Sequence, residues 1–218
     1  MNPKIAQWKK ELERITSDVT DTIESQFIFK RVVEIVGANP KINTDNLFWD
    51  HQRANFGAYM VLGVARQVDE RTEVVSLLKM LKDIRANSTV LTRDWFASQY
   101  EPNLPHQIGE QHFAEHFGSG TELDPTIVDQ DIKTLESATA KVERFRHTRI
   151  AHKNADERLV IELNFTEVEA ALKVVEDLVI KYQLLLNQAG YDRLMPTITY
   201  NWESIFRTPW IDNERTTP

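Results

Sequence analysis

Apolar residues recur at steps of three and four along most of this chain, and this repeat is the feature that most restricts its fold. The first stripe runs through Ile5, Trp8, Leu12, Ile15, Val19, Ile23 and Phe27. Only 7 Gly and 8 Pro interrupt the repeat. The pattern predicts an all-α fold, a helical bundle of five to six main helices, with a long N-terminal helix that ends at Gly37.

The same repeat predicts further helices over residues 46–68, 72–84, 92–100, 106–117, 125–152 and 166–190. Asn46 should cap the second helix, and Asp124 followed by Pro125 should begin the sixth. Thr166 and Glu169 have the spacing of a capping box for the last helix, which Gly190 should end. Within the second helix, Gly57 and Gly63 are expected to allow close helix approach.

We expect one helical domain over residues 1–218, with a core at about 46–190, an N-terminal helical arm at 1–37 and an aromatic C-terminal tail at 191–218. The tail carries Tyr200, Trp202, Phe206 and Trp210. Free tails rarely keep so many aromatic residues, so it should pack against the bundle or a second subunit.

Composition excludes several classes of protein. The chain has no cysteine, which rules out disulfides, thiolate metal sites and thiol nucleophiles and is typical of a reducing compartment. No signal peptide and no apolar run of 18 residues is found, so a cytoplasmic protein with no membrane span is expected. A net charge of −7 argues against general nucleic-acid binding but permits a local site.

The helix from Pro125 breaks its own pattern near its end. Its apolar stripe continues after Phe145 into Arg149 and His152, with Arg146 on the adjoining row. From Lys141 to Lys153 there are five Lys or Arg against one Glu, a local charge of +4. Cations in a last helical turn gain about 0.3–1 kcal/mol each from the helix dipole, which accounts for one or two of them. An arginine and a histidine on the core-facing stripe indicate an anion site instead.

These residues carry a resemblance to a known family. The segment FRHTRIAHKN, residues 145–154, resembles the Arg-x(4–6)-His signature of HEPN domains, with Arg146 and His152 in the two positions. The Ala-His form is most similar to the abortive-infection U branch. Upstream, RQVDERTEVVSLLKMLKDI resembles that branch's aspartate-then-Ser-Leu segment. The resemblance covers about residues 46–190.

The resemblance implies a dimeric, metal-independent endoribonuclease in a toxin–antitoxin or phage-defence setting, with an antitoxin or a nucleotidyltransferase as possible partner. It equally allows a relative that kept the fold as a non-catalytic binding or regulatory module. Active members usually have Asn or Asp after the motif arginine, whereas this chain has His147. A second imidazole could assist proton transfer, or it could mark a degenerate site.

RNA supplies its own 2′-hydroxyl as nucleophile, so no cofactor is expected. His152 suits general acid–base catalysis and Arg146 suits the phosphate charge. His147 is the third candidate catalytic residue, and the candidate substrate-binding residues are Arg149, Lys153 and Arg144. On an ideal α-helix Arg146 and His152 would point about 120° apart and lie ~9 Å apart along the axis. Either the helix ends near Ala151 or two chains share the site.

A competing motif is His112-Phe-Ala-Glu115-His116, which matches the H-x-x-E-H string of zinc proteases. His106 lies upstream, but no carboxylate stands out as a third ligand. We therefore expect no metal site and interpret these as surface histidines. His51 is expected to be partly buried.

Overall fold

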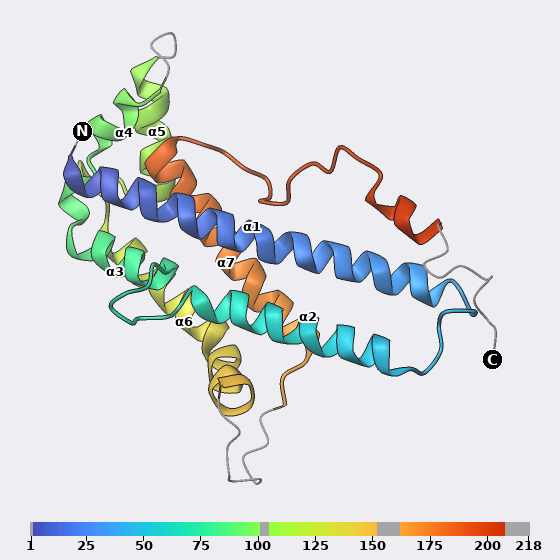
Figure 1. Cartoon of the computed structure of the whole chain (residues 1–218). Coiled ribbons are helices and arrows are strands. Elements are labelled where there is room, and N and C mark those ends of the chain that lie inside the picture. The colour runs from blue at the N-terminus through green and yellow to red at the C-terminus, as the bar shows by residue number, and fades with distance from the viewer. Residues whose placement is uncertain (1, 101–104, 152–161, 208–218) are drawn as a thin grey trace, which may run out of the picture.

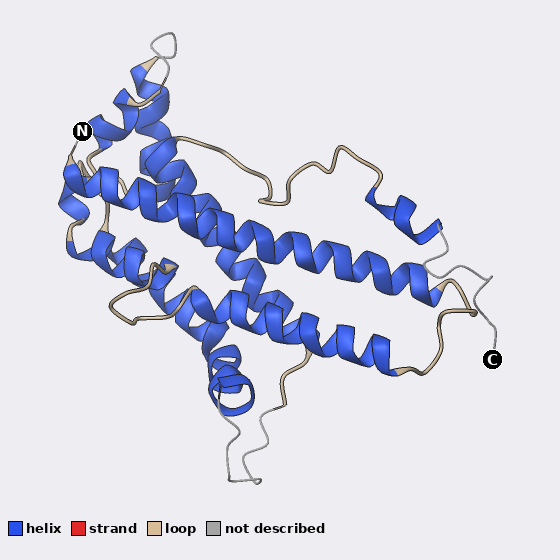
Figure 2. Cartoon of the chain, in the orientation of Figure 1, coloured by secondary structure: helices blue, strands red, loops and turns tan. Residues whose placement is uncertain are grey.

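The computed structural model describes residues 2–100, 105–151 and 162–207. Within these ranges the chain forms helices and no β-strand (Figure 2), which confirms the predicted all-α class. The α-helices are α1 (Pro3–Gly37), α2 (Leu47–Arg66), α3 (Leu77–Ala86), α4 (Arg93–Ser98), α5 (His106–Phe117), α6 (Pro125–Phe145) and α7 (Phe165–Asn187). Shorter turns are the 3-10 helices η1 (Ser88–Val90) and η3 (Trp202–Arg207) and the π-helix η2 (Arg146–Ala151).

Two helical hairpins pack on each other. Helices α1 and α2 run side by side in opposite directions, and α6 and α7 form the second pair (Figure 1). Helix α3 packs on α1 and α6, while α4 and α5 pair at one end of the bundle. This arrangement brings the end of α6 against α2.

The core is built from the apolar stripes that the sequence predicts. The N-terminal half of α1 is an integral part of it, because Trp8 and Leu12 are fully buried among residues of the other helices. The indole Nε1 of Trp8 donates to Asp83 Oδ2 of α3 at 2.8 Å, which satisfies the ring's polar atom. From α6, Leu135 and Val142 face the same cluster.

Helix starts agree with the sequence at some positions and not at others. The side chain of Asn46 accepts from Phe48 and Trp49, and that of Asp124 accepts from Thr126, so both predicted caps are confirmed. The capping box predicted at Thr166 and Glu169 is wrong. The capping box lies two residues earlier. The extended backbone at Asn164 lets its side chain accept from the Glu167 amide, and the Glu167 carboxylate accepts from the Asn164 amide.

Two other boundaries differ from the prediction. Helix α3 begins at Leu77 because the Ser76 hydroxyl accepts from the Lys79 amide and caps it there. Helix α7 ends at Asn187, since Gln188 adopts the left-handed conformation at φ 52°. Gly190 therefore does not form the C-cap.

The two glycines of α2 play different roles. A Cβ at Gly63 would lie 2.5 Å from Oγ1 of Thr22, a buried residue of α1, so the predicted close approach is confirmed here. A Cβ at Gly57 would meet nothing nearer than Phe165 Cζ at 3.9 Å, so the same prediction is wrong there.

Gly63→Ala should lower the free energy of unfolding by about 1–3 kcal/mol, because Thr22 is β-branched and hydrogen-bonded to Asp18 and cannot easily move aside. Gly57→Ala is the matched control and should raise it by about 0.5–1 kcal/mol through helix propensity. Urea unfolding followed by circular dichroism measures both. Equal midpoints for the two variants would contradict the packing described.

The C-terminal tail packs back onto the bundle, as predicted, through part of its aromatic set. The Leu194 amide donates to buried Glu176 of α7, and Glu203 accepts two hydrogen bonds from Arg31 of α1. The Trp202 ring meets Phe27 edge-on. Tyr200 is exposed, and Trp210 lies outside the described residues.

Candidate active site at the end of α6

Helix α6 changes type where the basic segment begins. It ends as an α-helix at Phe145, and residues 146–151 continue as the π-helix η2. The helix predicted to reach about His152 does continue to Ala151, where the described segment ends, but its last residues form wider π-turns in place of α-turns. The Thr148 hydroxyl donates to the Arg144 and Phe145 carbonyls at this junction. The separation expected from an ideal α-helix therefore does not apply to the residues after Phe145.

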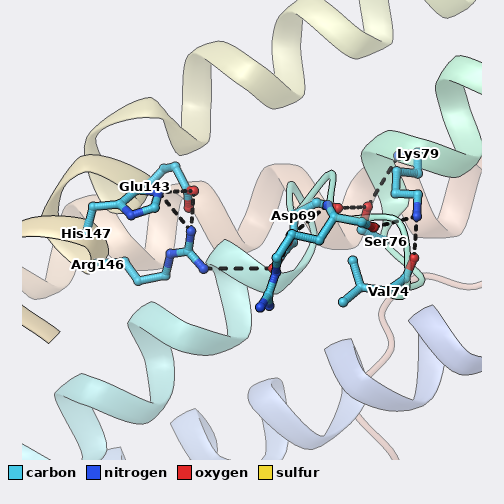
Figure 3. Close-up of polar contacts among 8 residues, drawn as sticks. Asp69, Val74, Ser76, Lys79, Glu143, Arg146 and His147 are labelled. Atoms are coloured by element: carbon cyan, nitrogen blue, oxygen red, sulfur yellow. Dashed lines mark hydrogen bonds and ion pairs between the residues drawn. The ribbon is translucent and has the colours of Figure 1, made fainter. Parts of the chain in front are cut away.

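Arg146 points inward from the first position of η2. Its side chain is only 17% exposed, and its Nη2 donates to Glu143 Oε1 at 2.6 Å. Its Nη1 lies 3.9 Å from Asp69 Oδ2, across the gap between η2 and the loop that follows α2 (Figure 3). Two carboxylates from separate parts of the chain thus fix the position of the guanidinium and offset its charge.

The loop that carries Asp69 is itself well held. The Ser76 hydroxyl donates to the Asp69 carbonyl at 2.7 Å, and Lys79 Nζ donates to the Val74 carbonyl (Figure 3). Lys79 Nζ also donates to the carbonyls of Arg71 and Thr72. Hydrogen bonds from the Arg71 side chain lower the pKa of Asp69 below its usual value. Asp69 therefore stays ionised, and its contribution to stability is lost only as the pH falls through that lowered pKa.

The Glu143–Arg146 pair is incomplete in hydrogen bonding. Within the described part of the chain, Arg146 Nε and Glu143 Oε2 are buried and have no hydrogen-bond partner. An arginine and a carboxylate can form two parallel hydrogen bonds, whereas this pair forms one. The guanidinium keeps donor capacity beyond its contacts with Glu143 and His147.

His147 lies at the surface beside Arg146, with 58% of its side chain exposed. Its Nε2 is 3.1 Å from Glu143 Oε1 and 3.0 Å from Arg146 Nη2. Only a protonated Nε2 can donate to the carboxylate, and only an unprotonated Nε2 can accept from the guanidinium. The ring therefore changes partner with its tautomer, and its exposure leaves it accessible to a substrate.

The structure describes only some of the other predicted site residues. Arg144 is exposed, and among the described residues its side chain reaches only the Ala140 carbonyl of its own helix. Lys141 pairs with Glu167 of α7, so one cation of the basic segment is neutralised. Arg149 belongs to η2, but its side chain lies outside the described part. His152 and Lys153 lie outside the described residues.

Asp69 and Glu143 are the site residues that the sequence did not reveal. Glu143 stands three positions before Arg146 on the helix, a spacing at which side chains meet, so that contact had a signal. Asp69 lies 77 positions away, and only the packing of α6 on α2 brings the two together. The aspartate belongs to the segment that resembles the abortive-infection U branch.

A family model described as AbiU2, within the HEPN group, matches residues 9–201, nearly the whole chain. The chain belongs to the AbiU2 branch of the HEPN family. No curated protein and no solved structure matches it.

The match to the AbiU2 model extends beyond residues 46–190, the region over which the sequence showed a resemblance. The match begins at residue 9, so it includes most of α1 as well as α2 to α7. This agrees with the burial of Leu12 and Ile15 of α1 in the common core. Among the described helices of this HEPN protein, none is both long and apolar enough to cross a bilayer.

The competing histidine motif takes part in ordinary packing. The Tyr100 hydroxyl lies 2.9 Å from His112 Nδ1, and burial raises the pKa of Tyr100. In the described ranges no three His, Cys, Asp or Glu side chains gather as metal ligands would. The His106 side chain is outside the described part. His51 is exposed, which corrects the expectation of partial burial.

Proposed function

We propose that this protein is a metal-independent endoribonuclease of the HEPN type that acts on RNA in the cytoplasm as a toxin or phage-defence component. Family membership supports the class of activity. The observation that carries the proposal is the guanidinium of Arg146, fixed from two directions beside the exposed imidazole of His147. A fixed cation suits the negative charge that develops on the phosphate, and an imidazole is a group that can assist proton transfer.

In the proposed reaction the RNA 2′-oxygen attacks the adjacent phosphorus, and the bond from phosphorus to the 5′-oxygen breaks. One proton leaves the 2′-hydroxyl and one joins the leaving 5′-oxygen; His152 carries out one of these two transfers, and solvent water carries out the other. Arg146 stabilises the charge on the non-bridging oxygens, for which guanidinium geometry is suited. Arg144, Arg149 and Lys153 hold neighbouring phosphates. The products are a 2′,3′-cyclic phosphate and a 5′-hydroxyl.

We further propose that two chains share the site. Arg149 and His152 continue the apolar stripe of α6 in the sequence, at positions that a monomer would fill with apolar side chains. A homodimer would present two copies of the basic segment to one RNA. Light scattering at micromolar concentration should give twice the 25.3 kDa of one chain, and a value of one chain would remove this part of the proposal.

Purified protein should cleave single-stranded RNA, and cleavage should persist in excess EDTA, because the nucleophile comes from the substrate and the positive charge from arginine. Mass spectrometry of the fragments should show 2′,3′-cyclic phosphate ends. A matched DNA oligonucleotide should remain intact, since it has no 2′-hydroxyl. Cleavage that EDTA abolishes, or that cuts the DNA, would overturn the mechanism.

A second function is favoured by a specific observation. Arg146 already faces two carboxylates, and His147 replaces the usual Asn or Asp after the motif arginine. Both features suit a non-catalytic HEPN module that binds a partner, such as an antitoxin or a nucleotidyltransferase, through this face. If the protein cleaves no RNA with or without EDTA, yet an Arg144→Glu change removes binding to such a partner, this alternative is the better one.

A further inference from the structure

An apolar groove of about 640 Å³ lies between the C-terminal half of α1 and residues 48–59 of α2, at the opposite end of the hairpin from the buried Trp8. Its apolar lining is Ile28, Phe29, Val32, Val33, Val36, Phe48, Trp49, Phe56, Tyr59 and Phe206. The first nine come from the hairpin, and Phe206 comes from η3 of the tail. The groove is distinct from the residues around Arg146.

The groove is left open by the described part of the chain. Ile28, Val33 and Phe48 are 42%, 50% and 48% exposed, although the preceding stripe of α1 is almost completely buried. Burying one such side chain fully is favourable by about 1.5–3 kcal/mol. An apolar surface of this kind on a helical hairpin indicates a binding site for another apolar segment.

We propose that the chain's own residues 208–211, Thr-Pro-Trp-Ile, occupy this groove, with Trp210 and Ile211 as the anchoring side chains. The proposal goes beyond the ribonuclease function and does not depend on it.

The anchoring of η3 is the first argument. Glu203 accepts hydrogen bonds from Arg31 at 2.7 and 3.2 Å, and Trp202 lies edge-on to Phe27, so η3 is fixed along α1 (Figure 1). Phe206, near the end of η3, already lines the groove. Trp210 follows it by four residues, and four residues span at most about 14 Å. This length of chain allows the indole to reach the groove.

The composition of the tail is the second argument. Trp210 and Ile211 are its last large apolar residues, and the sequence then becomes Asp-Asn-Glu-Arg-Thr-Thr-Pro. The apolar segment is thus short and adjoins the groove directly. A tethered segment also has an effective concentration in the millimolar range, which favours it over a separate chain that must give up its translational freedom.

Disulfide trapping tests the proposal, and the chain is suited to it because it has no cysteine. In Val33→Cys with Ile211→Cys, mild oxidation should close a disulfide within one chain at least ten times faster than in the control pair Val33→Cys with Thr217→Cys. Mass spectrometry of the peptides and a non-reducing gel identify the product. Equal rates for the two pairs would overturn the proposal, as would a disulfide formed between two chains, which would assign the groove to a second copy.

Hydrogen exchange gives an independent readout on the full chain without engineered cysteines. Trp210→Ala with Ile211→Ala should increase amide exchange several-fold in residues 28–36 of α1 and leave residues 5–15 unchanged. The control Thr216→Ala with Thr217→Ala should match the wild type. Unchanged exchange in residues 28–36 would count against the tail as occupant. Neither experiment contains RNA, so either result can stand whether or not the protein is a ribonuclease.

Discussion

Arg146→Ala should lower the rate of RNA cleavage by about 10²–10³-fold, the effect of removing one preorganised donor from a developing negative charge. His152→Ala should lower it by about 10²–10⁴-fold through the loss of general acid–base catalysis. The fold should survive the first change, because Asp69 keeps its hydrogen bonds to Arg71 when the guanidinium is removed. Initial rates on a labelled RNA, with helicity measured by circular dichroism, provide the test.

The matched control is Arg85→Ala. This arginine pairs with Asp129 at the surface on the α3 side of the bundle and has no contact with Arg146, so the cleavage rate should not change. His147→Ala separates the remaining roles: a large loss makes the ring a participant, and full activity makes it a bystander. If Arg146→Ala cleaved RNA as fast as the wild type while Arg85→Ala did not, the assignment of the active site to Arg146 would be contradicted.

Asp131→Ala should produce the largest loss of stability among single polar substitutions. Asp131 is buried on α6 and accepts hydrogen bonds from Lys181 Nζ and from the hydroxyl of Tyr182, both on α7. Burial raises the pKa of Tyr182 well above its usual value, and the neighbouring carboxylate adds to the shift. Truncation leaves the buried Tyr182 hydroxyl and the partly buried Lys181 ammonium without this acceptor, which costs about 1–3 kcal/mol.

Asp129→Ala, two residues earlier on the same helix, is the control. Its partner Arg85 is half exposed, and the loss should be below about 1 kcal/mol. Urea unfolding at neutral pH compares the two. Asp131→Asn should fall between them, because an amide oxygen still accepts from Tyr182 but no longer offsets the lysine charge. Equal losses at positions 129 and 131 would contradict a structural role for the buried carboxylate.

The sequence predicted those features of the fold that depend on local chemistry. The apolar stripes identified the helices, and short polar side chains marked starts at Asn46 and Asp124. At the last helix the same reasoning predicted Thr166, whereas the cap is Asn164. Both residues are good caps and both have a glutamate three positions later, and the backbone at Asn164 decides between them. Such a choice depends on where the preceding segment enters, which residue types alone do not specify.

The candidate site was predictable to the extent that it lies on one stretch of helix. Arg146 was identified from its position beside the end of an apolar stripe, Arg144 from the basic segment around it, and His147 from the resemblance to the HEPN signature. The change to a π-helix was not, since nothing in the spacing of Phe145 to Ala151 distinguishes a π-turn from an α-turn. The contact between Arg146 and Asp69 was not predicted either, because it depends on how α6 packs against α2.

Three phenylalanines link the apolar groove to the start of α7. The rings of Phe29, Phe56 and Phe165 lie nearly parallel, with centroids 3.9 Å apart for the first pair and 5.3 Å for the second. Phe29 and Phe56 line the groove, and Phe165 is the first residue of the helix that follows the motif segment. If occupation of the groove shifts this stack and thereby changes the affinity of the proposed site for RNA, then RNA must change the affinity of the groove by the same factor. The groove and the proposed RNA site would then be thermodynamically coupled, and the coupling could be measured by titrating either site.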